Sequence, residues 1–172
     1  MDQTTKILIL EGLDGCGKTA LANELKQSIE HKSIIIDSVD NKYITEYIRE
    51  NAQNCSLFIL DRSWLSGEAT RYASNHGGSA NLIQEWPSDI YKPTHLFLLT
   101  LPEEKRLMFM GQKQNQEFTN EEIRLRDDDK YRNDYLYALT HTVTKMKSIC
   151  VCRILDDLSI TDMAKNIRTL IQ

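Results

Sequence analysis

Length, composition and charge place this chain among ordinary globular domains. Its 172 residues are 41% hydrophobic and 27% charged, and a chain of this length usually forms one domain with one core. The 25 acidic residues outnumber the 21 basic ones, and the net charge of −4 argues against a general nucleic-acid-binding protein. The sequence contains no apolar run of about eighteen residues, so no transmembrane helix and no membrane partner are expected.

The cysteines and the first residues indicate the compartment. Cys16, Cys55, Cys150 and Cys152 are too few for a disulfide scaffold in a chain this long, and their spacing matches no common zinc pattern. Cys150 and Cys152 lie in an apolar run that is typical of a strand, so we expect them to be small core residues. The N-terminal residues form neither a signal peptide nor an arginine-rich transit peptide. These features predict a cytoplasmic protein.

Apolar runs and amphipathic stretches alternate along the first half of the chain. In chain order they predict a strand at 7–10, a glycine-rich turn, a helix at 18–30, a strand at 33–37, a helix at 41–52, a strand at 57–60 that ends at Asp61, and a helix at 64–73. The helix at 41–52 is expected to turn Tyr43, Ile44, Tyr47 and Ile48 inward.

The second half continues this alternation. It predicts a glycine-containing loop at 75–87, a strand at 95–99, a helix that begins at 102–104, a polar loop at 111–120, one long helix or two over 121–147, a strand at 149–155 and a helix at 160–171. Apolar strands that alternate with helices indicate a parallel sheet covered on both faces. We therefore expect a single α/β domain over 1–172, with a five-stranded parallel sheet flanked by helices.

A phosphate-binding motif lies between the first predicted strand and the first predicted helix. Its residues, Gly12, Leu13, Asp14, Gly15, Cys16, Gly17, Lys18 and Thr19, fit the pattern G-x-x-x-x-G-K-[ST]. The glycines let the backbone curl so that its N–H groups point inward and form an anion nest. Lys18 can then reach the β- and γ-phosphates of a nucleotide, and the hydroxyl of Thr19 can bind Mg²⁺. The strand and helix on either side make a chance match the weaker interpretation.

A second polar pair follows the third predicted strand. Because ligands of parallel α/β sheets collect at the carboxyl ends of the strands, Asp61 and Arg62 should lie beside the phosphate-binding loop. A carboxylate there can hold Mg²⁺ or its waters, and a guanidinium can bridge two phosphate oxygens. The alternative is a structural Asp–Arg pair that caps the next helix. With the loop, this pair favours the three-layer sandwich of P-loop NTPases.

Several stretches together resemble the thymidylate kinase family. Residues 9–19, ILEGLDGCGKT, are close to the family's EGxDGxGKT opening, and Asp61-Arg62 with Ser66 and Ala69 is similar to its DRYxxSxxAY segment. The run EWPSDIYKP at 85–93, followed by PEE at 102–104, resembles the thymidylate-kinase-like UMP–CMP kinases of the mitochondrial type. The resemblance spans nearly the whole chain and is most specific in these stretches.

The resemblance implies ATP- and Mg²⁺-dependent phosphoryl transfer to a pyrimidine nucleoside monophosphate. The roles that it implies are these: Lys18, Asp61 and Arg62 act in catalysis; residues 12–19 hold the ATP phosphates; Thr19, Glu11 and Asp61 lie at the metal, partly through water; and Asp14, Asp61, Arg62 and Ser66 meet the acceptor. In this type of reaction, positioning and charge neutralisation supply most of the catalysis.

The sequence departs from the family pattern in the acceptor-binding region. The connection between Asp37 and Asp61 is short, so the region at 38–55 is trimmed. Ser63 stands where the family has tyrosine. Thr70-Arg71 stands where the family has a Tyr-Gln-like pair, so the surface that reads the base has changed. Arg71 is either a new contact to the base or phosphate of the acceptor or an exposed helix arginine.

The second departure concerns the polar loop at 111–120, which corresponds to the lid over ATP. The positions where relatives carry a lid arginine hold Met108 and Gln112, and the phosphate-binding loop has Cys16 and no arginine. Lys113 is the one cation inside the loop, while Arg106, Arg124 and Arg126 flank it and are candidate substitutes. Because such an arginine accelerates transfer by orders of magnitude, we expect a slow enzyme or one with an unusual acceptor.

Three functions remain open from the sequence. The first is a kinase for dTMP, UMP, CMP, dUMP or dCMP; the second is a nucleotide-binding module of kinase descent with weak or no transfer; the third is a deoxynucleoside kinase. In each, the partners are small nucleotides or nucleosides rather than nucleic acid. An apolar stripe on the predicted long helix (Tyr131, Tyr135, Leu139, Val143 and Met146) is core by default, but the resemblance also allows a homodimer through such a helix.

Overall fold

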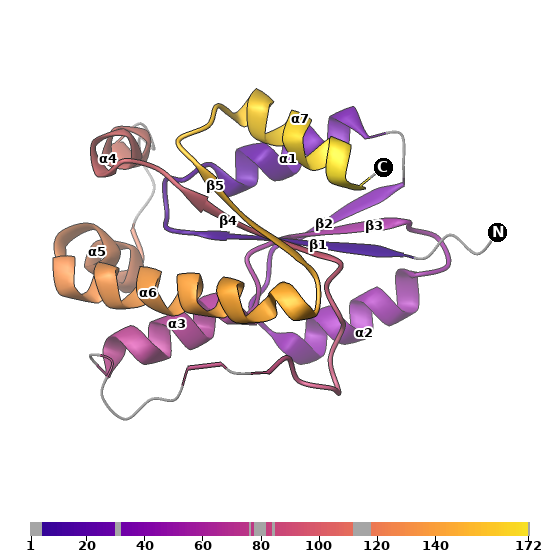
Figure 1. Cartoon of the computed structure of the whole chain (residues 1–172), viewed down its shortest axis with the longest axis horizontal. Coiled ribbons are helices and arrows are strands. Elements are labelled where there is room, and N and C mark those ends of the chain that lie inside the picture. The colour runs from indigo at the N-terminus through magenta and orange to yellow at the C-terminus, as the bar shows by residue number, and fades with distance from the viewer. Residues whose placement is uncertain are drawn as a thin grey trace.

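A five-stranded parallel sheet forms the centre of the protein. The computed structural model describes residues 5–29, 32–75, 77, 82–83, 85–111 and 118–171. The strands are β1 (Lys6–Gly12), β2 (Ser33–Ile36), β3 (Leu57–Asp61), β4 (His95–Thr100) and β5 (Val151–Asp156). They lie in the order β2-β3-β1-β4-β5, and every neighbouring pair is parallel (Figure 1). The α/β sandwich expected from the sequence is confirmed.

The three central strands carry the core. Side chains on both faces of β1, β3 and β4 are buried, among them Leu8, Ile9, Leu10, Phe58, Ile59, Leu60, Phe97 and Leu98. Continuous apolar runs of this kind suit parallel strands covered on both faces. The edge strand β5 differs, because Val151 and Ile154 are 43% and 48% exposed. Because these two side chains point to opposite faces, β5 is only partly covered on either face.

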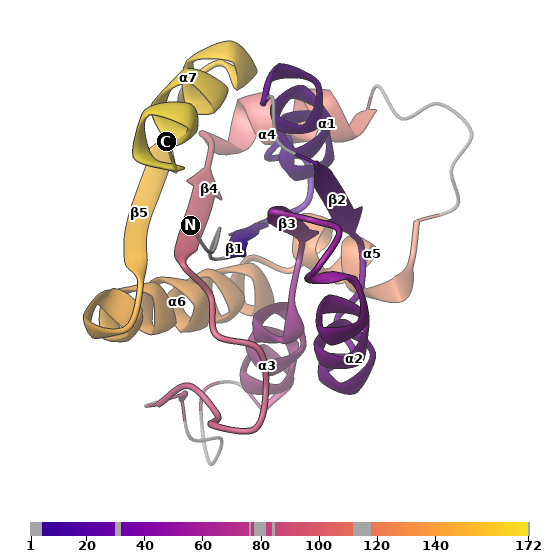
Figure 2. The ribbon, with the colours of Figure 1, turned by 90° about the vertical axis from the view of Figure 1, so that its right-hand side faces the viewer.

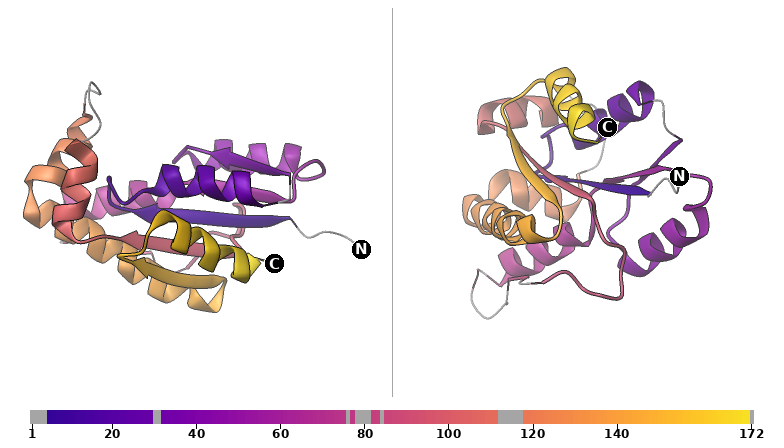
Figure 3. Two further views of the ribbon diagram at one scale, coloured as in Figure 1. Left: turned by 90° about the horizontal axis from the view of Figure 1, so that it is seen from above. Right: turned by 45° about the vertical axis from the view of Figure 1, so that its right-hand side comes forward.

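Helices cover both faces of the sheet. On one face lie α1 (Lys18–Ser28) and α7 (Ile160–Ile171); on the other lie α2 (Asn41–Asn51), α3 (Trp64–Ser74) and α6 (Asp129–Lys145) (Figures 1 and 2). The remaining helices, α4 (Glu103–Gly111) and α5 (Asn120–Asp127), stand beyond the carboxyl ends of the strands (Figure 3). A short 3₁₀ turn, η1 (Met146–Ser148), connects α6 to β5. No helix in the described ranges is long and apolar enough to cross a membrane.

The stretch after the polar loop forms two helices rather than one. At Asp128 the backbone turns to φ −109° and ψ 97°, which ends α5, and the Asp128 carboxylate then caps α6 by accepting from the backbone N–H of Tyr131. Thr119 and Glu122 form a reciprocal capping box at the start of α5. After this break α6 packs along α3 and against α5.

Three expectations from the sequence are wrong in detail. Tyr43 is 50% exposed, whereas Ile44 and Ile48 are buried as expected, because α2 presents only a narrow apolar stripe to the sheet. Cys150 and Cys152 are half-buried on the edge strand rather than core residues. The predicted loop at 111–120 is shorter at both ends, since Gly111 ends α4 and Asn120 begins α5; its residues 112–117, with Gln112 and Lys113, lie outside the described ranges.

Candidate active site

The phosphate-binding loop between β1 and α1 needs glycine at its bends. Gly12 has φ +144°, and a Cβ atom there would collide with the carbonyl oxygen of Leu99 on β4. Gly15 has φ +85°, and its Cβ atom would lie 2.7 Å from the carbonyl oxygen of Arg106. Both conformations and both close approaches disfavour any side chain. The loop is thus pressed between β4 and α4, which fixes the direction of its N–H groups.

Lys18 begins α1 and folds back over this loop. Its Nζ donates to the carbonyl oxygens of Gly12 at 2.8 Å and Leu13 at 2.9 Å, and the side chain is only 6% exposed. The N-cap of α1 is Gly17, which offers no side-chain acceptor to the first N–H groups of the helix. A helix N-terminus left uncapped in this way is a ready site for an anion.

Asp61 and Arg62 lie directly beside the loop, because β3 pairs with β1. Leu10 is in register with Asp61, and the backbone N–H of Arg62 donates to the carbonyl oxygen of Leu10 at 3.1 Å. The guanidinium of Arg62 forms an ion pair with Asp14 of the loop, and Lys18 lies 3.8 Å from the same Asp14 carboxylate. Burial disfavours the charged form of Arg62, but Asp14, Tyr135, Glu11 and Glu121 together outweigh it and raise the pKa of Arg62.

These side chains converge on one cavity of about 780 Å³. One wall is the loop and α1, with Asp14, Gly15, Gly17, Lys18 and Thr19; a second is the carboxyl edge of the sheet, with Asp37, Asp61 and Arg62; a third is formed by Phe109, Thr119, Glu122 and Ile160. The volume lies within the usual range for small-molecule sites, about 300–1,000 Å³. Cations, carboxylates and apolar side chains therefore meet in one space large enough for a nucleotide.

The oxygen groups in this cavity suit a magnesium ion. Thr19 is exposed to the cavity at the first turn of α1, and Asp61 lines the same space. Mg²⁺ prefers oxygen ligands and is usually held by one or two carboxylates with substrate phosphates, rather than by a cage made only of protein groups. The described ranges contain no cluster of three or more metal-ligating side chains. The donor set thus fits a metal that arrives with phosphates.

Glu11 was expected near the metal, but it does not line the cavity. It is fully buried, and its two carboxylate oxygens accept hydrogen bonds from Ser63 at 2.6 Å and Ser66 at 2.7 Å. Burial raises the pKa of Glu11, although the two serine hydroxyls and Lys18 oppose this shift. With both oxygens occupied and no contact with the cavity, Glu11 instead fixes the start of α3 against β1.

The other residues from the sequence interpretation divide into two groups. Leu13 and Cys16 are buried behind the loop and shape it from within. Ser66 is buried and turned toward Glu11 rather than lining the cavity. Arg71 lies outside the cavity on α3, where it is 46% exposed and forms an ion pair with Glu68. The structure thus brings Asp14, Lys18, Thr19, Asp61 and Arg62 together and leaves Ser66 and Arg71 apart from them.

The arginines that flank the polar loop do not line this cavity. Arg106 is 1% exposed and lies behind the phosphate-binding loop, where its Nη1 is 3.4 Å from the carbonyl oxygen of Asp14. Arg124 stacks over the ring of Tyr131 at 3.9 Å, and Arg126 pairs with Asp127. Among the described lining residues, Lys18 and Arg62 supply the positive charge.

Sequence reasoning missed several residues of the cavity wall. Asp37 follows β2 directly and lies at the same carboxyl edge as Asp61, so the strand-end argument applied to Asp61 would have found it. Phe109 and Ile160 carry no such signal, because an apolar residue in a helix is usually explained by packing. Their role becomes visible only when α4 and α7 are placed around the loop.

No protein-family model matches the chain, and no curated protein sequence matches it either. Solved structures are similar. Thymidylate kinase from Candida albicans gives a TM-score of 0.65 at 19% identity, over 98% of this chain and 91% of that one. Deoxyadenosine kinase from M. mycoides with bound dCTP gives 0.64 at 11% identity, over 96% and 98%. At these identities the likeness establishes the fold, which is that of these P-loop kinases.

Proposed function

We propose that the protein transfers a phosphoryl group from Mg²⁺-bound ATP to a pyrimidine nucleoside monophosphate. The observation that carries this proposal is the convergence of Lys18, Thr19, Asp61 and Arg62 on one cavity at the start of α1. The kinase fold supports it, and so does the resemblance of the loop and of Asp61-Arg62 to thymidylate kinases.

In this proposal each group of residues has a separate role in phosphoryl transfer. The N–H groups of the loop and the N-terminus of α1 hold the ATP phosphates, and Lys18 exchanges its bonds to the Gly12 and Leu13 carbonyls for phosphate oxygens. Thr19 and Asp61 would hold Mg²⁺, and the bound ion would supply charge neutralisation for the phosphates. Arg62, already aligned by Asp14, bridges the donor and acceptor phosphates and stabilises the charge that passes between them.

The test is ADP release from Mg·ATP with dTMP, dUMP, UMP, dCMP and CMP offered separately. We expect one of these monophosphates to stimulate release well above the rate with ATP alone. ATP binding without stimulation by any of them would contradict the kinase assignment and leave a nucleotide-binding module.

A deoxynucleoside kinase is the second candidate, and Asp37 is the observation that favours it. A nucleoside hydroxyl must lose a proton during transfer, whereas a phosphate oxygen need not, and a carboxylate in the cavity can accept that proton. Asp37 is exposed in the same cavity as Arg62. Thymidine turnover that exceeds dTMP turnover and falls in Asp37→Asn would establish this alternative; dTMP turnover that Asp37→Asn changes only a few-fold would exclude it.

A further inference from the structure

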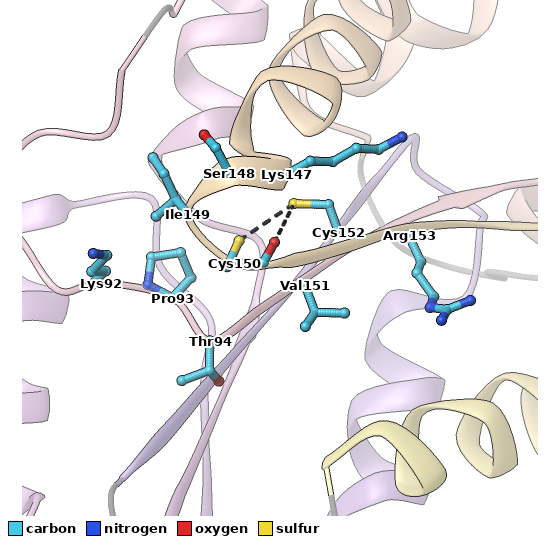
Figure 4. Close-up of a pocket in the computed structure, with 10 residues that line it drawn as sticks. All are labelled: Lys92, Pro93, Thr94, Lys147, Ser148, Ile149, Cys150, Val151, Cys152 and Arg153. Carbon is cyan, nitrogen blue, oxygen red and sulfur yellow. Dashed lines mark hydrogen bonds between the residues drawn. The ribbon is translucent and has the colours of Figure 1, made fainter.

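Cys150 and Cys152 form a dithiol at the start of β5, outside the nucleotide cavity. Their Sγ atoms lie 3.5 Å apart and share a hydrogen bond, so that the two sulfur atoms face each other across Val151 (Figure 4). Cys150 lies at the bend just before β5, and Cys152 is the second residue of that strand. Both residues are half-buried, whereas Cys16 and Cys55 are buried. The two thiols therefore contact each other, and both remain accessible to a reagent in solution.

The surroundings of this dithiol are hollow and basic. An open cavity of about 820 Å³ is lined by both cysteines together with Lys92, Lys147 and Arg153. The hydrogen bond from Cys150 lowers the pKa of Cys152 below its usual value, burial opposes this, and Lys147 adds to the lowering. The same hydrogen bond, with burial, raises the pKa of Cys150. Lys92 acts on Cys150 and Lys147 on Cys152, so each thiol has a lysine charge that favours its thiolate. Because the pKa of Cys152 is the one that is lowered, Cys152 is assigned as the attacking thiol in the proposal that follows.

We propose that Cys150 and Cys152 are a thiol–disulfide exchange site for an anionic small-molecule disulfide. The thiolate is the nucleophile in such exchange, and nearby cations favour it. Lys92 and Lys147, which line the same cavity, complement the carboxylates of a disulfide formed from an acidic peptide thiol. The site is separate from the proposed kinase chemistry and does not depend on it.

The exchange takes place in two balanced steps. The Cys152 thiolate attacks one sulfur of the reagent, its S–S bond breaks, and one thiol leaves after it takes up a proton. Cys150 then gives its proton to solvent and attacks Sγ of Cys152, which releases the second thiol and leaves a Cys150–Cys152 disulfide. Two electrons pass from the protein dithiol to the reagent, which is reduced to two thiols.

The position in the sheet separates this site from nucleotide binding. Cys152 is in register with Leu96 near the amino end of β4, whereas the phosphate-binding loop lies beyond the carboxyl ends of the strands. Neither cysteine lines the nucleotide cavity. Oxidation of the pair therefore ties the turn after η1 to β5 without touching Lys18 or Arg62.

The first test uses the reduced full-length protein with limiting glutathione disulfide, followed by alkylation and peptide mass mapping. We expect the peptide with Cys150 and Cys152 to lose two hydrogens first, while Cys16 and Cys55 remain alkylatable and serve as internal controls. Cystamine, a cationic disulfide, should react several-fold more slowly. Reaction of Cys150 and Cys152 no faster than that of Cys16 and Cys55, or equal rates with the two reagents, would overturn the proposal.

Single variants separate the two roles. Cys150→Ser should stop at a stable mixed disulfide between Cys152 and glutathione, and Cys152→Ser should lose the fast reaction. Serine is close in size to cysteine and both positions are half-buried, so the unfolding midpoint should stay near that of the parent; it is measured alongside. Fast reaction that persists in Cys152→Ser would contradict the assignment of the nucleophile.

Discussion

Arg62, the residue that follows β3, forms an ion pair with Asp14 in the phosphate-binding loop. The backbone of Arg62 has φ +82°, a conformation that is rare outside glycine, and its N–H is held by the carbonyl of Leu10. Strain of this kind persists where the surrounding structure fixes it, often at functional sites. The pair therefore aims a guanidinium into the cavity from a rigid position.

The first prediction concerns the fork geometry of Arg62. Arg62→Lys keeps the charge but loses the second donor that bridges two phosphates, so the rate of transfer should fall about 100-fold. The dissociation constant for ATP should change only a few-fold, because Lys18 and the loop hold the nucleotide. Steady-state kinetics and ATP titration check this. Arg168→Lys on α7, outside the cavity walls, is the matched control; a rate of Arg62→Lys equal to that of the control would refute the role.

The second prediction concerns the close approach of Gly12 to β4. Gly12→Ala adds a Cβ atom against the carbonyl of Leu99 and forces alanine to φ +144°, so it should lower the free energy of unfolding by at least about 2 kcal/mol. Gly67→Ala is the matched control, since Gly67 lies within α3 with open space around it. Gly67→Ala should raise the free energy of unfolding by about 0.5–1 kcal/mol. Urea unfolding of both variants measures the difference, and equal stabilities would contradict the packing described.

The third prediction concerns the buried carboxyl of Glu11. Its pKa is raised in the folded protein, so between the ordinary value of 4.5 and the raised value the folded state binds more protons than the unfolded state. Stability should therefore decline as the pH rises through that window. Glu11→Gln removes the ionisable group but keeps an amide that can hydrogen-bond with Ser63 and Ser66.

The measurement is the unfolding midpoint of both proteins from pH 4.5 upward. The variant should show a flatter dependence on pH and a higher midpoint at neutral pH than the parent. A parent that gains stability over the same range would mean that Glu11 is ionised in the fold and stabilised there.

The fold and the centre of the site were accessible from the sequence because their signals are local. Gly12–Thr19 is a contiguous motif, and each central strand is an apolar run, so periodicity and spacing located them. The break at Asp128 was left open, since two helices in succession carry one continuous amphipathic pattern and only the Asp128 cap separates them.

Residues whose place depends on tertiary packing were harder to predict. Glu11 precedes the loop in the sequence, but β1 turns its side chain toward Ser63 and Ser66. Arg106 flanks the polar loop in the sequence, but the register of α4 places it behind Asp14. Cys150 and Cys152 have an apolar sequence context, and only their position on an edge strand exposes them. In each case the deciding contact lies far away along the chain.

The central claim is ATP-dependent phosphoryl transfer at the Lys18 cavity, and the most direct measurement is acceptor-stimulated ADP release by the parent, Lys18→Ala and Lys130→Ala. Lys130 is 60% exposed on α6 and pairs with Asp134, which makes it the matched control. Lys18→Ala should lose about two to three orders of magnitude in rate, while Lys130→Ala keeps the parent rate. Equal ADP release by Lys18→Ala and the parent would contradict the account.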